Sequence, residues 1–344
     1  MRGTHCLAAL AAAFSSATAQ YQGFNYGAFF TDNSPKMQSD FEAKFKTAQN
    51  LEGAPGKGFT SARLYTTLQW GTASDIISAI PAAIPAAITT NTTLLLGIWC
   101  SAGHAIVSHE LTALRSAITT YGSNFTDLVG GISVGSEDLY RSSPTGIANH
   151  ENTGANTTAL VTYIARARDA VKDTALSQVP IGHVDTWSEW ADPKNRALVD
   201  AVDFVGMDAY SYWQSMVPNG VDRSKALFDD ALNRTRMAVG GKGDRGRGNK
   251  PVWVTETGFP VSGKTSNEAV PGVEGARRFW REVGCGLFGG EVNVWWYTLR
   301  DAGKRTPEPS FGIVGEELGT RPLFDISCPG VGGDEEDGEG CDPE

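Results

Sequence analysis

Two glutamates stand where apolar runs of the sequence end. The run Val129–Glu137 finishes at Glu137, and Glu256 lies one residue before the end of the run Val252–Thr257. The residues before each glutamate are those of a buried strand, so a carboxyl group at that point needs a specific purpose. Two carboxyl groups that meet at one opening can move protons to and from a bound molecule. We therefore take Glu137 and Glu256 as the candidate catalytic residues.

Aromatic and polar side chains stand at the ends of the other β-rich runs. Aromatic rings stack on sugar rings, while Arg, Asp and Tyr side chains form hydrogen bonds with sugar hydroxyls. The candidate binding residues found in this way are Tyr26, Arg63, Tyr65, Asp185, Trp187, Asp208, Tyr210 and Tyr297. Trp99 and Trp296 fit a wall of the core equally well, and Arg63 could instead form a structural pair with Asp208. The set predicts a cleft for a carbohydrate, and the acidic balance of the chain favours a neutral polysaccharide.

Short β-rich runs alternate with stretches of helical periodicity along the chain. The clearest helical stretch is Thr158–Lys172, and prolines at 81 and 85 predict a kinked or split helix in the segment Ser78–Pro85. The expected strands are Gly23–Phe30, Ser61–Thr67, Thr93–Ser101, Val129–Glu137, Pro180–Trp187, Phe204–Tyr210, Val252–Thr257 and Glu291–Leu299.

This alternation predicts an α/β protein with a parallel sheet covered on both faces. Eight repeats in about 300 residues fit a single-domain (β/α)8 barrel better than an open doubly wound sheet, since no G-x-G-x-x-G follows the first run. The carboxyl ends of barrel strands meet at one face, which would bring Glu137 and Glu256 to one opening. Trp253, three residues before Glu256, would then face the helix layer.

The termini predict three segments in the 344-residue chain. Residues 1–19 have the charged start, short apolar stretch and A-x-A site of a secretory signal peptide. Residues 20–328 form the expected catalytic domain, and residues 329–344 form an acidic tail too polar to pack. No other apolar run approaches the roughly 18 residues of a membrane span, and no lipid-anchor signal is present. We therefore expect a secreted, extracellular protein and leave attachment to a cell wall open.

A secreted protein can carry disulfides and glycans. Once the signal peptide is removed, three pairings of four cysteines are open, of which Cys285 with Cys328 is preferred. Neither C-x-x-C nor H-E-x-x-H occurs, so we expect no metal and no cofactor. The N-x-[ST] triplets that predict glycosylation begin at Asn91, Asn124, Asn156 and Asn233.

Charge and two short motifs bear on other functions. The chain has 29 Lys and Arg against 39 Asp and Glu, a net charge of −10, without a basic run, so we expect no nucleic-acid partner. We also expect a monomer. Gly258–Thr265 satisfies the P-loop pattern, but several loop-forming residues separate it from the next helix. Gly131–Gly135 satisfies G-x-S-x-G, but Ser133 lies within a run and not at a sharp turn. Nucleotide binding and esterase activity are therefore disfavoured.

Two segments, Val134–Arg141 and Val252–Pro260, resemble the active-site motifs of glycoside hydrolase family 17, the secreted β-1,3-glucanases and glucanosyltransferases of fungi and plants. The segments Gly23–Gly27, Arg63–Tyr65 and Trp295–Tyr297 match as well, and the resemblance extends from about residue 23 to residue 326. It implies a (β/α)8 barrel that cleaves β-1,3-glucan with retention.

The resemblance also implies roles for single residues. Glu137 would be the acid/base, which requires a raised pKa, and Glu256 the nucleophile, with the two carboxyl groups about 5–5.5 Å apart. Many relatives have Asn immediately before the acid/base, where its amide can contact the sugar 2-hydroxyl, and this chain has the shorter Ser136. Ser136 therefore joins the candidate substrate-binding residues. The alternatives are a glucanosyltransferase that remodels wall glucan and a non-catalytic glucan-binding wall protein.

Overall fold

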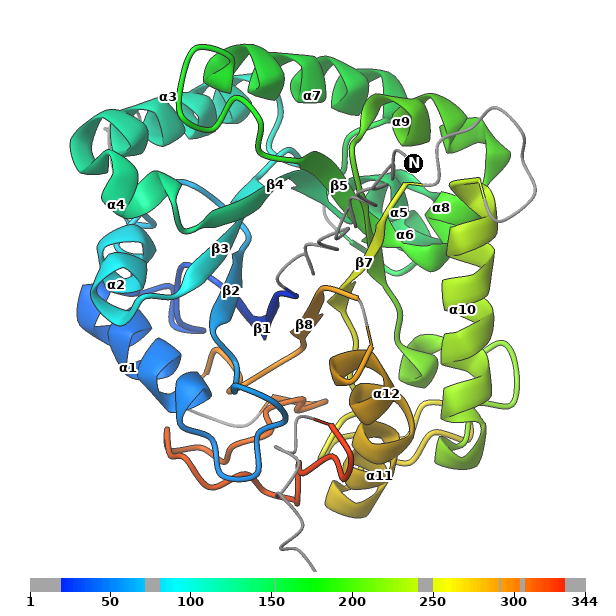
Figure 1. Ribbon diagram of the computed structural model, residues 1–344. Helices are drawn as coiled ribbons and strands as arrows, with labels where there is room; N and C mark the ends of the chain where they lie inside the picture. The colour runs from blue at the N-terminus through cyan, green and yellow to red at the C-terminus, as the bar shows by residue number, and fades with distance from the viewer. Residues whose placement is uncertain are drawn as a thin grey trace, which may run out of the picture.

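The computed structural model describes residues 20–71, 81–151, 153–240, 250–290, 292–303 and 307–331. The predicted signal peptide, residues 332–344 of the predicted tail and Cys341 lie outside the described residues. Eight parallel strands close into a barrel in the order β1 to β8, and helices surround it (Figure 1). The predicted (β/α)8 barrel is therefore confirmed.

The strands are β1 Gln22–Tyr26, β2 Ser61–Leu64, β3 Thr93–Ile98, β4 Val129–Ser136, β5 Ile181–Thr186, β6 Val205–Asp208, β7 Val252–Glu256 and β8 Val294–Trp296. The helices are α1 Gln38–Gln49, α2 Ala83–Thr90, α3 His104–Tyr121, α4 Ser123–Thr126, α5 Asp138–Ser142, α6 Pro144–Ala148, α7 Thr157–Val171, α8 Trp187–Ala191, α9 Arg196–Ala201, α10 Ser224–Ala238, α11 Val273–Phe279 and α12 Cys285–Phe288.

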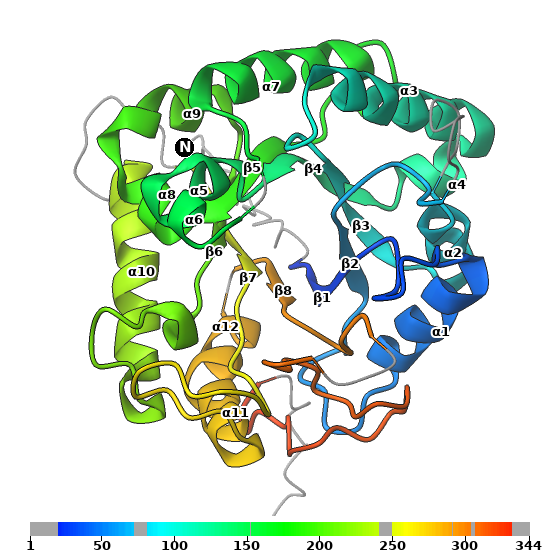
Figure 2. The same ribbon diagram turned by 180° about the vertical axis from the view of Figure 1, so that it is seen from behind.

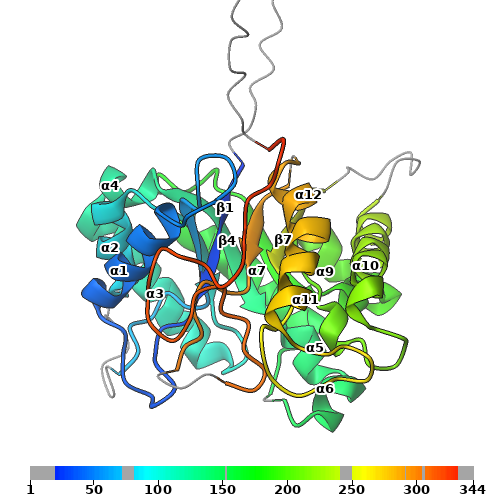
Figure 3. The same ribbon diagram turned by 90° about the horizontal axis from the view of Figure 1, so that it is seen from below.

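All eight strands end earlier than the sequence predicts. Except for β8, each begins within one residue of its expected start, whereas β1 ends at Tyr26 and not at Phe30. The last residues of each apolar run leave the sheet to form the loops at the carboxyl end of the barrel. Figure 3 shows this end at the bottom, where α5 and α6 lie.

The helix expected at Thr158–Lys172 is confirmed, whereas the kink expected in Ser78–Pro85 is not found at Pro85. Helix α7 is displaced by one residue from the expected Thr158–Lys172, and the Asn156 side chain caps it by accepting a hydrogen bond from the backbone N–H of Ala159 at 3.0 Å. Pro85 does not kink α2, because it is the third residue of that helix, where a backbone N–H has no partner within the helix. Residues 78–80 lie outside the described part of the chain.

A layer of large side chains fills the interior of the barrel at its amino end. It consists of Leu95, Phe204, Trp253 and Trp295, with the rings of Phe204 and Trp253 stacked at 3.7 Å. Gly131 on β4 accommodates Trp253, since a Cβ atom there would come within 2.9 Å of the indole. The prediction that Trp253 faces the helix layer is therefore wrong. The register between β6 and β7 shifts between Val254 and Glu256. The alternation of strand faces is interrupted there, so the face of Trp253 cannot be deduced from its odd separation from Glu256.

The C-terminal segment is fastened to the outside of the barrel (Figure 1, orange to red). Cys285 and Cys328 form a disulfide, as preferred from the sequence, and Cys100 is buried and not disulfide-bonded among the described cysteines. Trp280 donates a hydrogen bond to the carbonyl of Ile326 at 2.9 Å. The segment therefore closes over the helices between β7 and β8.

Removing the disulfide should destabilise this closure. The bond links residues 43 positions apart, a loop whose closure entropy corresponds to about 4 kcal/mol. We expect the Cys285→Ser/Cys328→Ser double variant to lose a free energy of unfolding of that order, measured by urea denaturation. A variant of the unbonded Cys100, Cys100→Ala, is the control for loss of a thiol. A double variant as stable as the parent would contradict the prediction.

Candidate active site

A large cleft opens at the carboxyl end of the barrel, the end that faces the viewer in Figure 2. Its volume is about 1640 Å³, and both Glu137 and Glu256 line it. Glu137 directly follows β4, and Glu256 is the last residue of β7. The two candidate catalytic carboxyl groups therefore share one cleft.

Glu256 is held by three donors from three different strands or loops. Arg63 donates to its Oε1 at 2.6 Å, the hydroxyl of Tyr65 donates to the same oxygen at 2.6 Å, and the hydroxyl of Tyr210 donates to Oε2 at 2.7 Å. Burial and the charge of Glu256 raise the pKa of both tyrosines, so both remain protonated donors. These bonds fix the orientation of the carboxylate.

Arg63 itself is fully buried and connects the two halves of the site. One amino group bonds to Glu256 and to the side-chain oxygen of Asn25 at 2.8 Å, and the other bonds to the hydroxyl of Ser136 at 2.8 Å. Asn25 in turn donates to the carbonyls of Thr255 and residues of β8. Arg63 thus links Glu256 to the residue beside Glu137.

Asp208 lies next to this cluster. It does not form the structural pair with Arg63 that the sequence left open as an alternative. Its Oδ1 accepts a hydrogen bond from Thr255 at 2.6 Å. Burial, followed by the charge of Glu256, raises the pKa of Asp208 well above its usual range.

Glu137 sits on a sharp turn between β4 and α5. Its backbone is left-handed, with φ 55°, and its N–H bonds to the carbonyl of Val184 at 2.9 Å. Such a conformation is costly for a residue other than glycine and is found where the surrounding structure enforces it. Burial and the charge of Glu256 raise the pKa of Glu137 to about 8, although Arg141, 3.9 Å away, lowers it. The pairing with Arg141 is thus present, and Glu137 still lines the cleft.

Most of the other predicted binding residues line the cleft, and three do not. Tyr26 is 3% exposed and points into the helix layer, where its ring meets Phe45 of α1 edge-on at 4.9 Å. It follows the inward-facing Asn25, and neighbouring strand positions face opposite sides. Arg63 is buried behind Glu256, and Asp185 is buried beneath the Glu137 turn. The predicted residues that line the cleft are Tyr65, Ser136, Trp187, Asp208, Tyr210 and Tyr297.

Several cleft residues were missed or undervalued in the sequence. The ring of Trp99 lies in the cleft wall, with the guanidinium of Arg141 4.9 Å from its centre. Phe29 and Trp70 form a half-exposed pair with ring centres 4.4 Å apart, and Trp213 is 55% exposed. Phe29 and Trp70 stand in loops, and Trp213 ends a short 3-10 helix; all three lie beyond the strand ends, where no periodicity singles them out. Trp296, the other uncertain tryptophan, packs in the helix layer against Trp280.

The two competing motifs do not form their sites. No helix follows Gly258–Thr265 directly, since the next described helix, α11, begins at Val273. Ser133 is buried in the middle of β4 and bonds to the carbonyl of Leu96 at 3.3 Å. A phosphate cradle and a serine elbow are therefore both absent from these segments.

Other kinds of site would need metal ligands or a membrane-spanning helix among the described residues. Among them, no group of three or more His, Cys, Asp or Glu side chains is placed to hold a metal ion. None of the helices in this part of the chain is long and apolar enough to cross a membrane.

Comparison with known proteins places the chain in a family. Residues 23–315 match the BtgE/BtgC glycoside hydrolase domain. A probable glucan endo-1,3-β-glucosidase of Aspergillus terreus is 53% identical over 323 residues, which are 94% of this chain and 63% of that protein. A glucan 1,3-β-glucosidase of Saccharomyces cerevisiae is 29% identical over 79% of this chain and 78% of that protein. The chain thus spans less than two thirds of the length of the Aspergillus terreus relative.

Solved structures share the fold. A glycoside hydrolase family 17 β-1,3-glucanosyltransferase from Rhizomucor miehei is 21% identical, with a TM-score of 0.67, and the match covers 91% of this chain and 98% of that one. An endo-laminarinase from Formosa is 14% identical, with a TM-score of 0.64, over 86% of this chain and 84% of the other.

Proposed function

The chain belongs to the BtgE/BtgC glycoside hydrolase family, and on that premise we propose that it cleaves β-1,3-glucan with retention of configuration. Its membership confirms the resemblance to glycoside hydrolases drawn from the sequence. The observation that carries the proposal is one cleft lined by two carboxyl groups in contrasting surroundings. Glu137 has a raised pKa, and Glu256 is a carboxylate held by Arg63 and two tyrosines.

These contrasting surroundings suit two different roles. A carboxyl group with a pKa near 8 is protonated at neutral pH and can act as a general acid. A carboxylate whose oxygens are fixed by Arg63, Tyr65 and Tyr210 is oriented for attack and does not need to be protonated. We therefore assign the acid/base role to Glu137 and the nucleophile role to Glu256.

In the first step, an oxygen of Glu256 attacks the anomeric carbon while the glycosidic C–O bond breaks. Glu137 gives its proton to the departing oxygen, so the shortened glucan leaves as an alcohol. A covalent bond joins Glu256 to the remaining sugar. The hydrogen bonds of Tyr65 and Tyr210 hold the carboxylate during this attack.

In the second step, the ionised Glu137 takes a proton from an attacking water, whose oxygen bonds to the anomeric carbon. The bond to Glu256 breaks, and the sugar is released with its original configuration. A hydroxyl of a second glucan chain in place of water would give transfer. Ser136, whose oxygen already accepts a bond from Arg63, keeps one hydroxyl proton to donate to the sugar.

The shape and lining of the cleft support a long polysaccharide as substrate. Aromatic rings from several loops line it, namely those of Phe29, Tyr65, Trp70, Trp99, Tyr140, Trp187, Tyr210, Trp213, Tyr297 and Phe311. Such rings stack on the faces of successive sugars without requiring charge. We propose a glucan substrate, since relatives that are 50–53% identical to this chain are named for glucan cleavage.

The disulfide bears on the compartment in which the protein acts. A disulfide such as Cys285–Cys328 persists in oxidising surroundings, which supports secretion of the chain. We propose that the protein is extracellular and acts on glucan outside the cell.

Incubation with laminarin oligosaccharides tests the proposed function. We follow product length by chromatography and compare the protein with its Glu256→Gln variant. Shorter products that form with the parent protein and not with the Glu256→Gln variant support hydrolysis. Longer products support transfer. Binding of laminarin without any product would reject an enzyme and favour a glucan-binding protein.

A further inference from the structure

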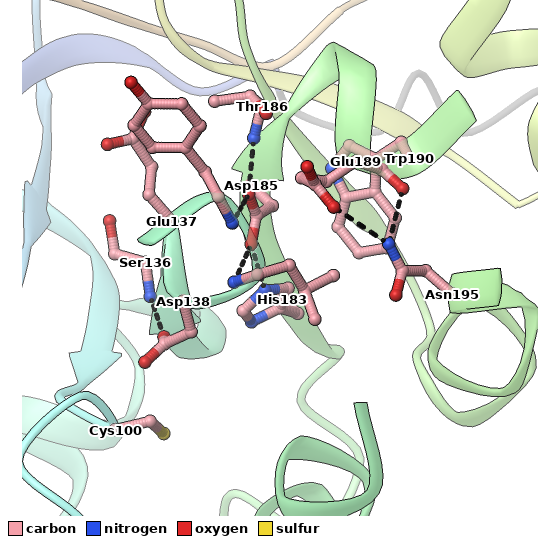
Figure 4. Close-up of polar contacts among 12 residues, drawn as sticks. Cys100, Ser136, Glu137, Asp138, His183, Asp185, Thr186, Glu189, Trp190 and Asn195 are labelled. Atoms are coloured by element: carbon pink, nitrogen blue, oxygen red, sulfur yellow. Dashed lines mark hydrogen bonds and ion pairs between the residues drawn. The ribbon is translucent and has the colours of Figure 1, made fainter. Parts of the chain in front are cut away.

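A buried histidine lies below the turn that carries Glu137. His183 is on β5 and is fully buried together with Asp185, two residues further on, and with Asp138, which begins α5. Figure 4 shows the three side chains gathered beside Ser136 and Glu137. None of them touches the cleft, so the proposed reaction does not use them directly.

Both ring nitrogens of His183 face acceptors. Nδ1 lies 2.6 Å from the carbonyl oxygen of Val134, which can only accept, and Nε2 lies 3.0 Å from Oδ2 of Asp185. Both oxygens of Asp185 already accept backbone N–H bonds, from Leu139, Tyr140 and Thr186, as a carboxylate does. A histidine between two acceptors needs a proton on each nitrogen, so this geometry favours an imidazolium ion at His183.

The surrounding charges agree with this assignment. Burial alone would lower the pKa of His183, but the hydrogen bond and charge of Asp185, followed by the charge of Asp138, outweigh burial and raise it. Burial raises the pKa of Asp138, whereas His183 lowers it. One cation therefore lies between two acidic side chains in the interior.

The two acidic side chains hold the turn at several points. Asp185 binds the N–H groups of Leu139 and Tyr140, and Asp138 binds the N–H of Ser136 at 2.9 Å and the hydroxyl of Ser101 at 2.7 Å. The turn passes so close to this cluster that Gly135, with φ 89°, has no room for a side chain. A Cβ atom there would come within 2.3 Å of Asp138 and 2.8 Å of His183.

We propose that His183 is a positioning residue for the acid/base: as a buried imidazolium it fixes Asp185 and Asp138, and through them the turn of residues 135–140 that aims Glu137 into the cleft. The inference rests on the proposed role of Glu137. Without the positive charge, two carboxyl groups would face each other below the turn, and the left-handed backbone at Glu137 would lose its support.

The same cluster contributes to the electrostatic surroundings of Glu137, after burial, Glu256 and Arg141. The charges that face Glu137 come from four elements: Glu256 on β7, Arg141 on α5, Asp185 on β5 and Arg63 on β2. Asp185 raises the pKa of Glu137, and His183 offsets the charge of Asp185. Removing His183 should therefore raise the pKa of Glu137, and removing the charge of Asp185 should lower it.

Kinetics of three variants on laminarin test the proposal. We expect His183→Gln to lower kcat by roughly 10- to 100-fold with KM changed by less than about threefold, and to move the basic limb of the pH profile upward by about 0.5–1 unit. Asp185→Asn should move the same limb downward. Trp190→Phe is the matched control. The ring of Trp190 meets His183 edge-on at 5.5 Å. The variant loses the buried hydrogen bond from this indole to the carbonyl of Gly206 and leaves the contacts of the turn in place. It should keep the pH profile of the parent.

A second measurement does not depend on activity. In protein with ¹⁵N-labelled histidine, the ring signals of His183 should keep imidazolium shifts at pH 7.5, when exposed histidines have lost their charge. If His183→Gln fails to fold, Asp138→Asn, which keeps the bond between His183 and Asp185, should still lower kcat with little change in KM.

A neutral ring at pH 7.5, or folded His183→Gln or Asp138→Asn protein with the kcat and pH profile of the parent, would overturn the inference. These outcomes leave the proposed function standing as long as the parent protein cleaves laminarin. A parent protein that does not cleave laminarin would instead reject the proposed function and leave the imidazolium at His183 untouched.

Discussion

The Glu256→Ala variant is expected to lose about 10⁴-fold or more in kcat on laminarin and to regain activity with sodium azide. Alanine leaves a space where the nucleophile was, next to Arg63, Tyr65 and Tyr210, which still point at it. Azide entering that space attacks the anomeric carbon from the face that Glu256 used. The product on a β-glucoside with a dinitrophenyl leaving group should therefore be an α-glycosyl azide, identified by NMR.

The stereochemistry of the azide adduct separates the two roles. A β-glycosyl azide from this variant would mean that Glu256 is the acid/base and that the assignment is reversed. Glu274, an exposed glutamate on α11 paired with Arg277, supplies the control Glu274→Ala, which should keep the activity of the parent. Wild-type rates without azide would remove Glu256 from the mechanism.

The Glu137→Gln variant is expected to lose about 10³-fold or more in kcat/KM on laminarin, where the leaving oxygen needs a proton. On the dinitrophenyl glucoside, whose leaving group needs no proton, formation of the glycosyl-enzyme should be nearly unchanged. The comparison by burst kinetics of the two substrates isolates proton donation. An equal loss on both substrates would argue against the acid role.

The pH profile follows from the direction of the pKa shift. Glu137 must be protonated in the free enzyme, so kcat/KM of the parent should fall as pH rises through about 8, and the Glu137→Gln variant should lack this limb.

The same shift bears on stability. The folded protein holds the proton of Glu137 more tightly than the unfolded chain does. The protonated carboxyl group therefore adds to the free energy of unfolding below about pH 4.5, and this stabilisation is lost as pH rises through about 8. Glu137→Gln should therefore melt no lower than the parent at pH 8, which also checks that it folds.

The order of elements and the two glutamates were predictable because their signals are local. Apolar runs of strand length and helical periodicity are properties of neighbouring residues, and a carboxyl group at the end of a buried run is visible without knowledge of its partners. The strand ends were predicted less well, since nothing local shows where the chain leaves the sheet. At Glu137 that point depends on contacts of the turn with β5 and α5.

The partners of each side chain could not be predicted, because they come from distant parts of the chain. Arg63 and Glu256 are 193 residues apart and form a buried pair at 2.6 Å, whereas the sequence left a pair of Arg63 with Asp208 open as an alternative to a binding role. Tyr26 stands at a strand end like Tyr65, yet its position on β1 turns it into the helix layer against Phe45. Trp253 shows the same limit, since a shift in register reversed the face that counting assigned to it.

The amino-acid sequence by itself determined that eight strands alternate with helices and that Glu137 and Glu256 stand at strand ends, since burial and periodicity act over a few residues. Only the tertiary structure decided which side chains reach the cleft and which charges stand beside each carboxyl group. Closing the barrel brings Arg63 to Glu256 and His183 beneath Glu137. Those neighbours set how firmly each carboxyl group is held and whether it keeps its proton, and that difference divides the chemistry between them.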